Sequence, residues 1–260
     1  MTRPSALVTG AAGGIGSAVV RRLDAEGYDV LAVDRCAGPD AAPYAMPSEA
    51  DLAALTAGLD HVWPLVADVC DPHQMRSAAA RAIEQWGRLD VVVAAAAVVG
   101  GGAPLWQTPA AELDRLWRVD AEGVFHTAAA TVPEMLAGPD PSRGRFVAIA
   151  SAAGSRGMFG LGAYTMVKHA VVGLVRGLAA DLVGTGTTAV AVSPGATRTP
   201  MLEQTAALYP DTTVADLASH QLLRRVLEPD EIAATVALCC SREGAALNGH
   251  VVHADGGFAS

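Results

Sequence analysis

The chain has 260 residues and a formal net charge of -9, and 51% of its residues are hydrophobic against 17% charged. This apolar content supports a large buried core and excludes a disordered chain. The acidic balance and the scattered Lys and Arg residues disfavour nucleic acid as a partner, because duplex binding needs a clustered basic face.

No uninterrupted apolar stretch reaches the roughly 18 residues of a membrane span. The N-terminus also lacks the apolar core and cleavage site of a signal peptide. The cysteines Cys36, Cys70, Cys239 and Cys240 follow no CxxC or Cys/His metal spacing. We therefore expect a cytoplasmic globular protein with reduced thiols, no metal site and no membrane contact.

Short β-branched runs alternate with longer helical patterns along almost the whole chain. The expected strands are residues 6–9, 29–33, 65–67, 89–94, 145–150, 188–193 and 250–253. The expected helices are residues 14–27, 72–86, 109–136, 163–183 and 230–240. This alternation predicts an α/β fold of Rossmann type, with about seven strands in a doubly wound parallel sheet and helices on both faces.

Two segments interrupt this rhythm. Residues 37–59 form a Pro- and Ala-rich insert with an expected short helix from Ser48, and residues 200–228 are expected to form a mobile substrate loop. Neither segment resembles a linker between domains, so residues 1–260 are expected to fold as one domain.

A glycine-rich turn joins the first expected strand to the first expected helix, where residues 9–16 read TGAAGGIG. Glycines allow a tight turn and close backbone approach to a pyrophosphate, and the helix N-terminus offers free N–H groups to the phosphates. The candidate phosphate-binding residues are Gly10, Ala12, Gly13, Gly14, Ile15 and Gly16.

Asp34 ends the second strand, eighteen residues after Gly16. A carboxylate there accepts hydrogen bonds from the adenosine ribose and repels a 2′-phosphate, which favours NAD. Arg35 follows it and could pair with a 2′-phosphate, so an NADP-dependent carbonyl reductase is the alternative. Gly13 stands where a basic residue would help NADP, and this again favours NAD.

Five further features follow in order along the chain. They are Asp68-Val69, Ser151, Tyr164-x-x-x-Lys168, the run SPGATRTP at residues 193–200, and Asp255-Gly256-Gly257. Together with the glycine-rich turn, they resemble the short-chain dehydrogenase/reductase family. Tyr164 and Lys168 lie one helical turn apart and therefore project from the same face.

The resemblance implies a site for each step of the chemistry. Tyr164 would be the general acid/base, Lys168 would lower its pKa and anchor the cofactor ribose, and Ser151 would hold the substrate oxygen. The further cofactor contacts that it implies are Asp68, Val69, Ala94, Ala95, Ala96, Pro194, Gly195, Thr197, Thr199 and Met201, with Tyr164 and Lys168 again among them.

The sequence departs from the family pattern in two places. Ala94-Ala95-Ala96-Ala97 replaces the usual Asn-Asn-Ala-Gly and loses side-chain hydrogen bonds, each worth about 1 kcal/mol. Asp120 stands at the position of the relay asparagine, where it could accept a hydrogen bond from Lys168 but adds a negative charge. These departures favour a second alternative, a non-catalytic dinucleotide-binding protein of the same fold.

The insert and the stretch from Thr199 to Pro229 also resemble the mycofactocin-associated actinobacterial members of the family. That resemblance implies NAD held without free exchange and electrons that leave through a separate redox partner. Apolar residues before Tyr164 and in the substrate loop favour an apolar secondary or cyclic alcohol, or its ketone. The family resemblance and the small residues of the helix around 163–181 favour a homotetramer or homodimer.

Overall fold

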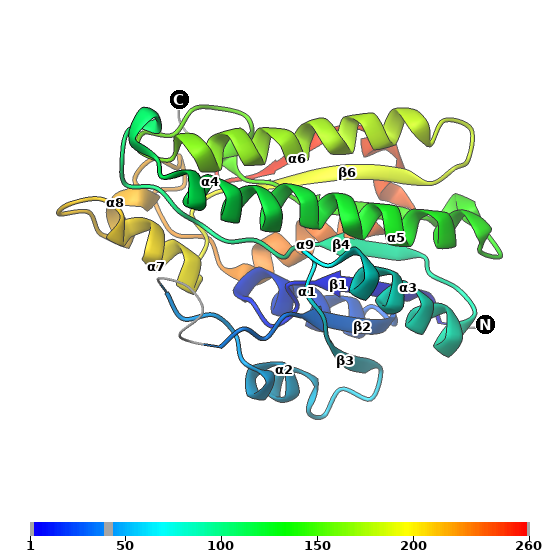
Figure 1. The fold of residues 1–260 in the computed structure, drawn as a ribbon. Helices are drawn as coiled ribbons and strands as arrows, with labels where there is room; N and C mark the ends of the chain where they lie inside the picture. Colours follow the sequence, from blue (N-terminus) through cyan, green and yellow to red (C-terminus); the bar gives the residue numbers. More distant parts are fainter. Residues whose placement is uncertain (1–2, 39–43, 259–260) are drawn as a thin grey trace.

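The computed structural model describes residues 3–38 and 44–258, in which seven parallel strands form one sheet in the order β3-β2-β1-β4-β5-β6-β7 (Figure 1). The strands are β1 (Ser5–Thr9), β2 (Asp29–Asp34), β3 (Val62–Val66), β4 (Val91–Ala94), β5 (Arg145–Ile149), β6 (Thr188–Pro194) and β7 (Val251–Ala254). The chain order reverses between β1 and β4, as in a doubly wound sheet. The predicted fold class is confirmed.

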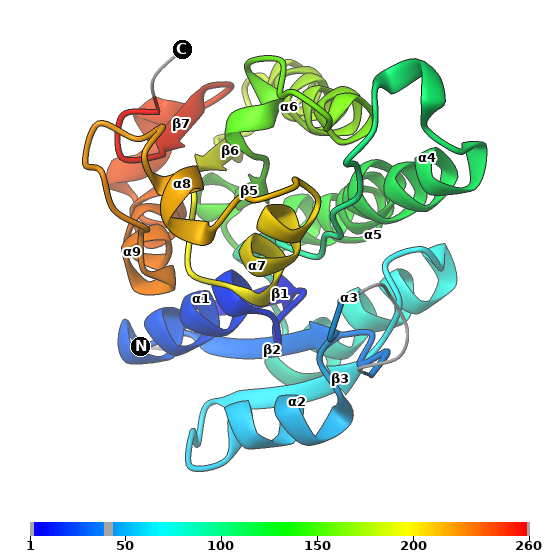
Figure 2. The same cartoon turned by 90° about the vertical axis from the view of Figure 1, so that its left-hand side faces the viewer.

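Helices cover both faces of this sheet (Figures 1 and 2). The α-helices are α1 (Gly14–Ala25), α2 (Glu49–Thr56), α3 (Pro72–Trp86), α4 (Ala110–Leu116), α5 (Gly123–Ala137), α6 (Gly162–Asp181), α7 (Pro200–Ala207), α8 (Val214–Ala218) and α9 (Pro229–Cys240). Helices α3, α5 and α6 lie against one face, and α1 and α9 pack on the other. No helix in the described ranges is long and apolar enough to span a membrane.

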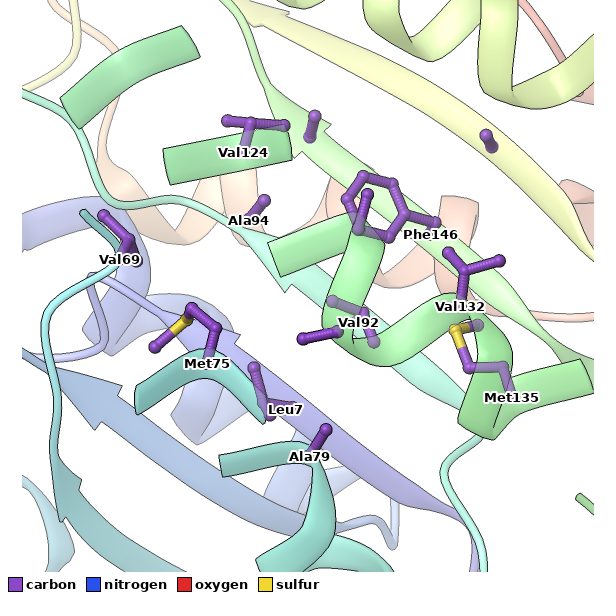
Figure 3. Packing of buried hydrophobic residues seen from close by; sticks show 14 of the residues in the cluster. Leu7, Val69, Met75, Ala79, Val92, Ala94, Val124, Val132, Met135 and Phe146 are labelled. Carbon is purple, nitrogen blue, oxygen red and sulfur yellow. The ribbon is translucent and has the colours of Figure 1, made fainter. Parts of the chain in front are cut away.

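The strands are apolar on both sides because each side faces a helical layer. Side chains alternate along a strand, so Leu7 joins the cluster beneath α3 and α5, and its neighbour Val8 joins the cluster beneath α1 and α9. In Figure 3, Phe146 of β5 and Val92 of β4 lie opposite Val132 of α5. The rigid sheet formed in this way fixes the strand ends from which the site is built.

The third strand differs from its prediction, since it spans Val62–Val66 rather than residues 65–67. Proline has no backbone N–H to donate, which restricts it to edge strands and bulges. β3 lies at the edge of the sheet and pairs only with β2 among the described strands, so Pro64 needs no second partner. The edge position therefore tolerates a residue that a central strand would reject.

The helix predicted over residues 109–136 is instead three consecutive segments. Between α4 and α5 the backbone widens into a π-helix over Trp117–Glu122. Such widening is rare and inserts an extra residue into the helical path, which changes the direction of the side chains that follow. Asp120 lies in this π-helix and is fully buried.

Both interrupting segments contain helices. The expected helix after Ser48 is α2, in which Ser48 and Asp51 form a capping box, and residues 39–43 of the insert lie outside the described residues. The segment 200–228 holds α7 and α8. In Figure 2, α7 and α8 lie in front of the sheet, across the ends of β1, β5 and β6.

Candidate active site

A cavity of about 830 Å³ opens at the carboxyl ends of the parallel strands. Ligands of doubly wound sheets bind at this end, where the strand order reverses. The cavity extends from the glycine-rich turn and Asp34 to Tyr164 and the helix α7. Of the predicted cofactor residues it is lined by Gly10, Ala12, Gly13, Gly14, Ile15, Gly16, Asp34, Arg35, Asp68, Val69, Ala95, Ala96, Tyr164, Lys168, Pro194, Gly195, Thr197, Thr199 and Met201.

Two predicted residues do not border this cavity. Ala94 lies in β4, and its side chain packs into the core with Leu7 and Val92 (Figure 3). It therefore supports the sheet and offers no side-chain contact to a cofactor. Asp120 lies behind Lys168, so that the lysine separates it from the cavity.

The glycine-rich turn leaves no room for a side chain at Gly10, Gly14 or Gly16. Gly10 has a positive φ of 64°, and a Cβ at Gly16 would collide with the Gly10 carbonyl oxygen. Helix α1 begins at Gly14 without a side-chain cap on Gly13, so its first N–H groups face the cavity uncapped. This backbone cradle fits a dinucleotide pyrophosphate, which such N–H groups bind.

Asp34 connects the end of β2 to this turn. Its Oδ2 atom accepts the Ala12 amide at 3.0 Å, and its Oδ1 atom accepts the Cys36 amide at 2.9 Å. Each oxygen keeps a further lone pair, which can accept a ribose hydroxyl. Arg35 forms an ion pair with Asp68 at 3.4 Å, so its guanidinium already faces a carboxylate across the adenosine end of the cavity.

Ser151, Tyr164 and Lys168 come together at the other end of the cavity. Ser151 lies two residues after the end of β5, and its hydroxyl accepts the Ala153 amide at 3.1 Å. Tyr164 lies in the first turn of α6, and the Lys168 ammonium lies 5.5 Å from the centre of its ring. Nζ of Lys168 also donates to the Ile149 carbonyl at 3.4 Å, which connects α6 to the end of β5.

Burial is the main influence on Tyr164. It raises the pKa of the Tyr164 phenol above its ordinary value, and the Lys168 ammonium offsets only part of this rise. The Asp120 carboxylate raises that pKa further, whereas the Ser151 hydroxyl lowers it. Lys168 therefore acts in the direction that the resemblance implies, but burial outweighs it and the net pKa of Tyr164 is raised.

Asp120 contacts Lys168 directly. Its Oδ2 atom lies 3.0 Å from Nζ of Lys168, and its Oδ1 atom accepts the Val98 amide at 2.8 Å. Burial alone would lower the pKa of Lys168, but the neighbouring Asp120 carboxylate raises it above its ordinary value. Lys168 is therefore held as an ammonium beneath the cavity.

Backbone amides just after the end of β4 donate hydrogen bonds to side chains from other elements. The Thr9 hydroxyl accepts the amides of Ala95 and Ala96 at 3.2 and 3.4 Å. Asp120 accepts the amide of Val98. The hydrogen bonds expected to be lost with the asparagines are thus partly replaced by Thr9 and Asp120.

Tyr44 is a site residue that the sequence-based reasoning missed. It comes from the insert after Asp34, yet its hydroxyl accepts the amide of Val99 at 3.3 Å, and its ring packs among the residues around Tyr164. The insert therefore reaches from the adenosine end of the cavity to the catalytic end. A lone aromatic residue in a segment rich in proline and alanine is the signal that could have identified it.

The substrate side of the cavity is mostly apolar. Its walls include Met158, Phe159, Leu161, Met201, Leu202 and Tyr209, together with Leu217, His220 and Phe258, which the sequence-based reasoning did not single out. The Phe258 ring stacks on His220, and the Arg156 guanidinium lies 5.3 Å from its centre and donates to its carbonyl. The chain near its C-terminus is therefore part of the cavity wall.

Comparisons with known proteins agree with this geometry. Residues 10–259 match a family model described as Enoyl-(Acyl carrier protein) reductase. An uncharacterised NAD-dependent oxidoreductase of Mycobacterium tuberculosis is 32% identical over 97% of this chain and 94% of its own length. An NAD(+)-dependent 2-dehydro-3-deoxy-L-rhamnonate dehydrogenase of Sphingomonas is 30% identical over 92% of this chain and 88% of its own.

The chain belongs to the short-chain dehydrogenase/reductase family. Among solved structures of the family, the carveol dehydrogenase from Mycobacterium avium in complex with NAD has a TM-score of 0.91, 29% identity and coverage of 99% of this chain and 98% of its own. A levodione reductase has a TM-score of 0.86 and 31% identity, covering 98% and 97%. This member of the family is an NAD-dependent oxidoreductase.

Proposed function

We propose that the protein interconverts an apolar alcohol and its ketone, with Tyr164 as general acid/base. The observation that carries this proposal is that Ser151, Tyr164 and Lys168 meet in one cavity with the glycine-rich turn and Asp34. When bound, NAD takes a hydride from the alcohol carbon or returns it to the ketone. The residues of the chain then have to bind the oxygen of the substrate and move its proton.

Three side chains divide this work. The ionised Tyr164 phenol takes the hydroxyl proton of the alcohol and returns it in the reverse direction. The Ser151 hydroxyl orients the substrate oxygen, and the Lys168 ammonium favours the phenolate against the effect of burial. Turnover of a panel of apolar alcohols, compared between the wild type and Tyr164→Phe, tests the assignment.

The cavity walls support the proposed substrate class. Apart from the catalytic residues, the cavity wall near Tyr164 includes the apolar side chains of Met158, Leu161 and Met201. Such walls favour an apolar, secondary or cyclic alcohol over a phosphorylated or carboxylated one. The similarity to a carveol dehydrogenase and a levodione reductase supports the same alcohol–ketone chemistry.

We also propose that NAD stays bound through the catalytic cycle. Ala37 and the segment from Tyr44 to Pro47 line the cavity, and the Tyr44 hydroxyl accepts the amide of Val99. A cofactor beneath this segment would leave only after the segment opened. The electrons would then pass to a separate redox partner, as in the mycofactocin-associated members.

The first prediction is that the purified protein retains stoichiometric NAD after dialysis. Tyr44→Phe removes one hydrogen bond and should raise the rate of NAD loss by about fivefold, the effect of roughly 1 kcal/mol. Mass spectrometry of the nucleotide released by denaturation, at intervals during dialysis, measures both. Tyr28→Phe, at the opposite end of the sheet, is the matched control. A protein that is purified empty and exchanges added NAD freely would contradict the proposal.

The second prediction concerns the choice of cofactor. Asp34→Ala should weaken NAD binding and reduce the discrimination against NADP by about 10- to 100-fold, because two hydrogen-bonded carboxylate oxygens and a repelling charge disappear. Affinities for both nucleotides are measured by calorimetry on stripped protein. Unchanged discrimination would mean that Arg35 or another group selects the cofactor.

A homo-oligomer is proposed from the outer side of α6. Met166 is 43% exposed there, and a Cβ on Gly173 or Gly177 would meet no atom within 4 Å. A side of small and apolar residues lets a second copy of the helix approach closely, which supports a dimer or tetramer. Sedimentation of the purified protein measures its state.

A further inference from the structure

The buried carboxylate next to the catalytic lysine has a precise set of contacts. Asp120 is fully buried in the π-helix between α4 and α5. One oxygen accepts the Val98 amide at 2.8 Å, and the other lies 3.0 Å from Nζ of Lys168. The carboxylate is therefore fixed from two sides and cannot turn away from the lysine.

The lysine is held equally firmly. Lys168 is 2% exposed, and its ammonium lies between the Asp120 carboxylate, the Ile149 carbonyl at 3.4 Å and the face of the Tyr164 ring at 5.5 Å. Both groups are almost fully buried, so a carboxylate at 3.0 Å cancels much of the field of the ammonium. Tyr164 therefore faces a neutral ion pair rather than an isolated cation.

The other charged or titratable groups around this pair are few among the described residues. Tyr44 of the insert interacts electrostatically with Tyr164 and Asp120. Arg115 of α4 interacts electrostatically with Tyr44 and Asp120. Its guanidinium also donates to the Val99 carbonyl. Burial keeps Tyr44 a neutral phenol, since it raises the pKa of Tyr44 to about 12. The ion pair is thus the main local source of field at the Tyr164 hydroxyl.

We propose that Asp120 is a positioning residue for the proton transfer: its carboxylate fixes the Lys168 ammonium and opposes the field of that ammonium at the Tyr164 hydroxyl. This inference rests on the proposed function, in which Tyr164 exchanges the proton of the substrate. Because Asp120 raises the pKa of Tyr164, the site favours the phenol, the form that donates a proton to a ketone. Alcohol oxidation needs the phenolate and is therefore displaced to higher pH.

Removal of the Asp120 charge tests the inference. In Asp120→Asn the ammonium would act on Tyr164 without opposition, so the rising limb of alcohol oxidation should move to lower pH by about one unit or more. Asparagine has one side-chain oxygen, so it cannot offer separate oxygens to the Val98 amide and to Lys168 as Asp120 does. Asp120→Ala, which has neither oxygen, is therefore made as well. If charge is the cause, both variants shift in the same direction despite their different hydrogen bonds.

A second measurement does not depend on turnover. The phenolate absorbance of Tyr164, obtained as the difference between each protein and its Tyr164→Phe counterpart, should titrate at lower pH in both Asp120 variants. Asp114→Asn, which removes an exposed carboxylate from the neighbouring helix α4, is the matched control and should move neither curve.

The outcomes separate the inference from the proposed function. No shift overturns the inference, and so does a shift to higher pH, which would mean that Asp120 acts only by keeping the lysine charged. If Tyr164→Phe turns over alcohols as fast as the wild type, the proposed function itself is wrong. If Tyr164→Phe is inactive and the Asp120 variants keep the wild-type curves, only the role of Asp120 is wrong.

Discussion

Tyr164→Phe is expected to slow hydride transfer by about 10²- to 10⁴-fold, the usual contribution of a general acid/base. The substitution removes only the hydroxyl, and the ring keeps its contacts with the buried cluster that contains Val167 and Leu161. The fold and the bound nucleotide should therefore persist. Single-turnover reduction of bound NAD by excess alcohol measures the chemical step without the step of electron transfer to a partner.

Tyr28→Phe serves as the control for this experiment. Its hydroxyl lies 3.4 Å from the Cys240 carbonyl, and the residue does not border the active-site cavity. The rate of hydride transfer in Tyr28→Phe should match that of the wild type. If neither the wild type nor Tyr164→Phe reduces its nucleotide with any alcohol, and neither oxidises NADH with a ketone, the chain is better described as a non-catalytic dinucleotide-binding protein.

Much of the fold follows from local patterns in the sequence. Strands buried on both faces must be apolar throughout, and this requirement makes runs such as Val91–Ala94 recognisable without knowledge of their neighbours. The predicted bounds of β3 were wrong: the strand runs through Pro64, which an edge strand tolerates, and the edge position depends on the strand order. That order is a property of the whole sheet.

The π-helix could not be predicted for a related reason. Residues 109–136 have a helical pattern throughout, and the extra residue in Trp117–Glu122 is stabilised by tertiary contacts, such as that between Asp120 and Val98. The sequence motif placed Asp120 near Lys168. It allowed a direct contact with Lys168, but it did not indicate that the pair would be almost fully buried.

The contact of Tyr44 shows what is hardest to obtain from one sequence. Tyr44 and Val99 are 55 residues apart, and they meet only because the insert follows β2 while the loop of Val99 follows β4. The glycine-rich turn and Tyr164-x-x-x-Lys168 are local patterns with fixed spacing. A contact between two irregular segments has no such spacing, so it becomes visible only in the folded chain.

Lys168→Met is expected to destabilise the protein by about 3–5 kcal/mol at neutral pH, the usual result of breaking a buried ion pair. Methionine fills much of the lysine volume, but the Asp120 carboxylate remains fully buried, with the Val98 amide as its remaining close partner among the described residues. Denaturant unfolding of the stripped proteins at fixed pH measures the difference. The variant also loses the proposed ribose anchor, so its activity does not report on stability.

The pH dependence identifies the cause of this loss. Burial raises the pKa of Asp120, and in the variant the lowering effect of Lys168 is absent, so the folded-state pKa lies above the unfolded one. A protonated Asp120 costs little to bury. The difference in the free energy of unfolding between the wild type and Lys168→Met is therefore largest above the raised pKa of Asp120, and it decreases as the pH falls through that pKa. Lys168→Met combined with Asp120→Asn should recover part of the lost stability at neutral pH, because no buried charge remains. If Lys168→Met alone is as stable as the wild type at neutral pH, the ion pair between Lys168 and Asp120 contributes no more stability than an exposed ion pair does.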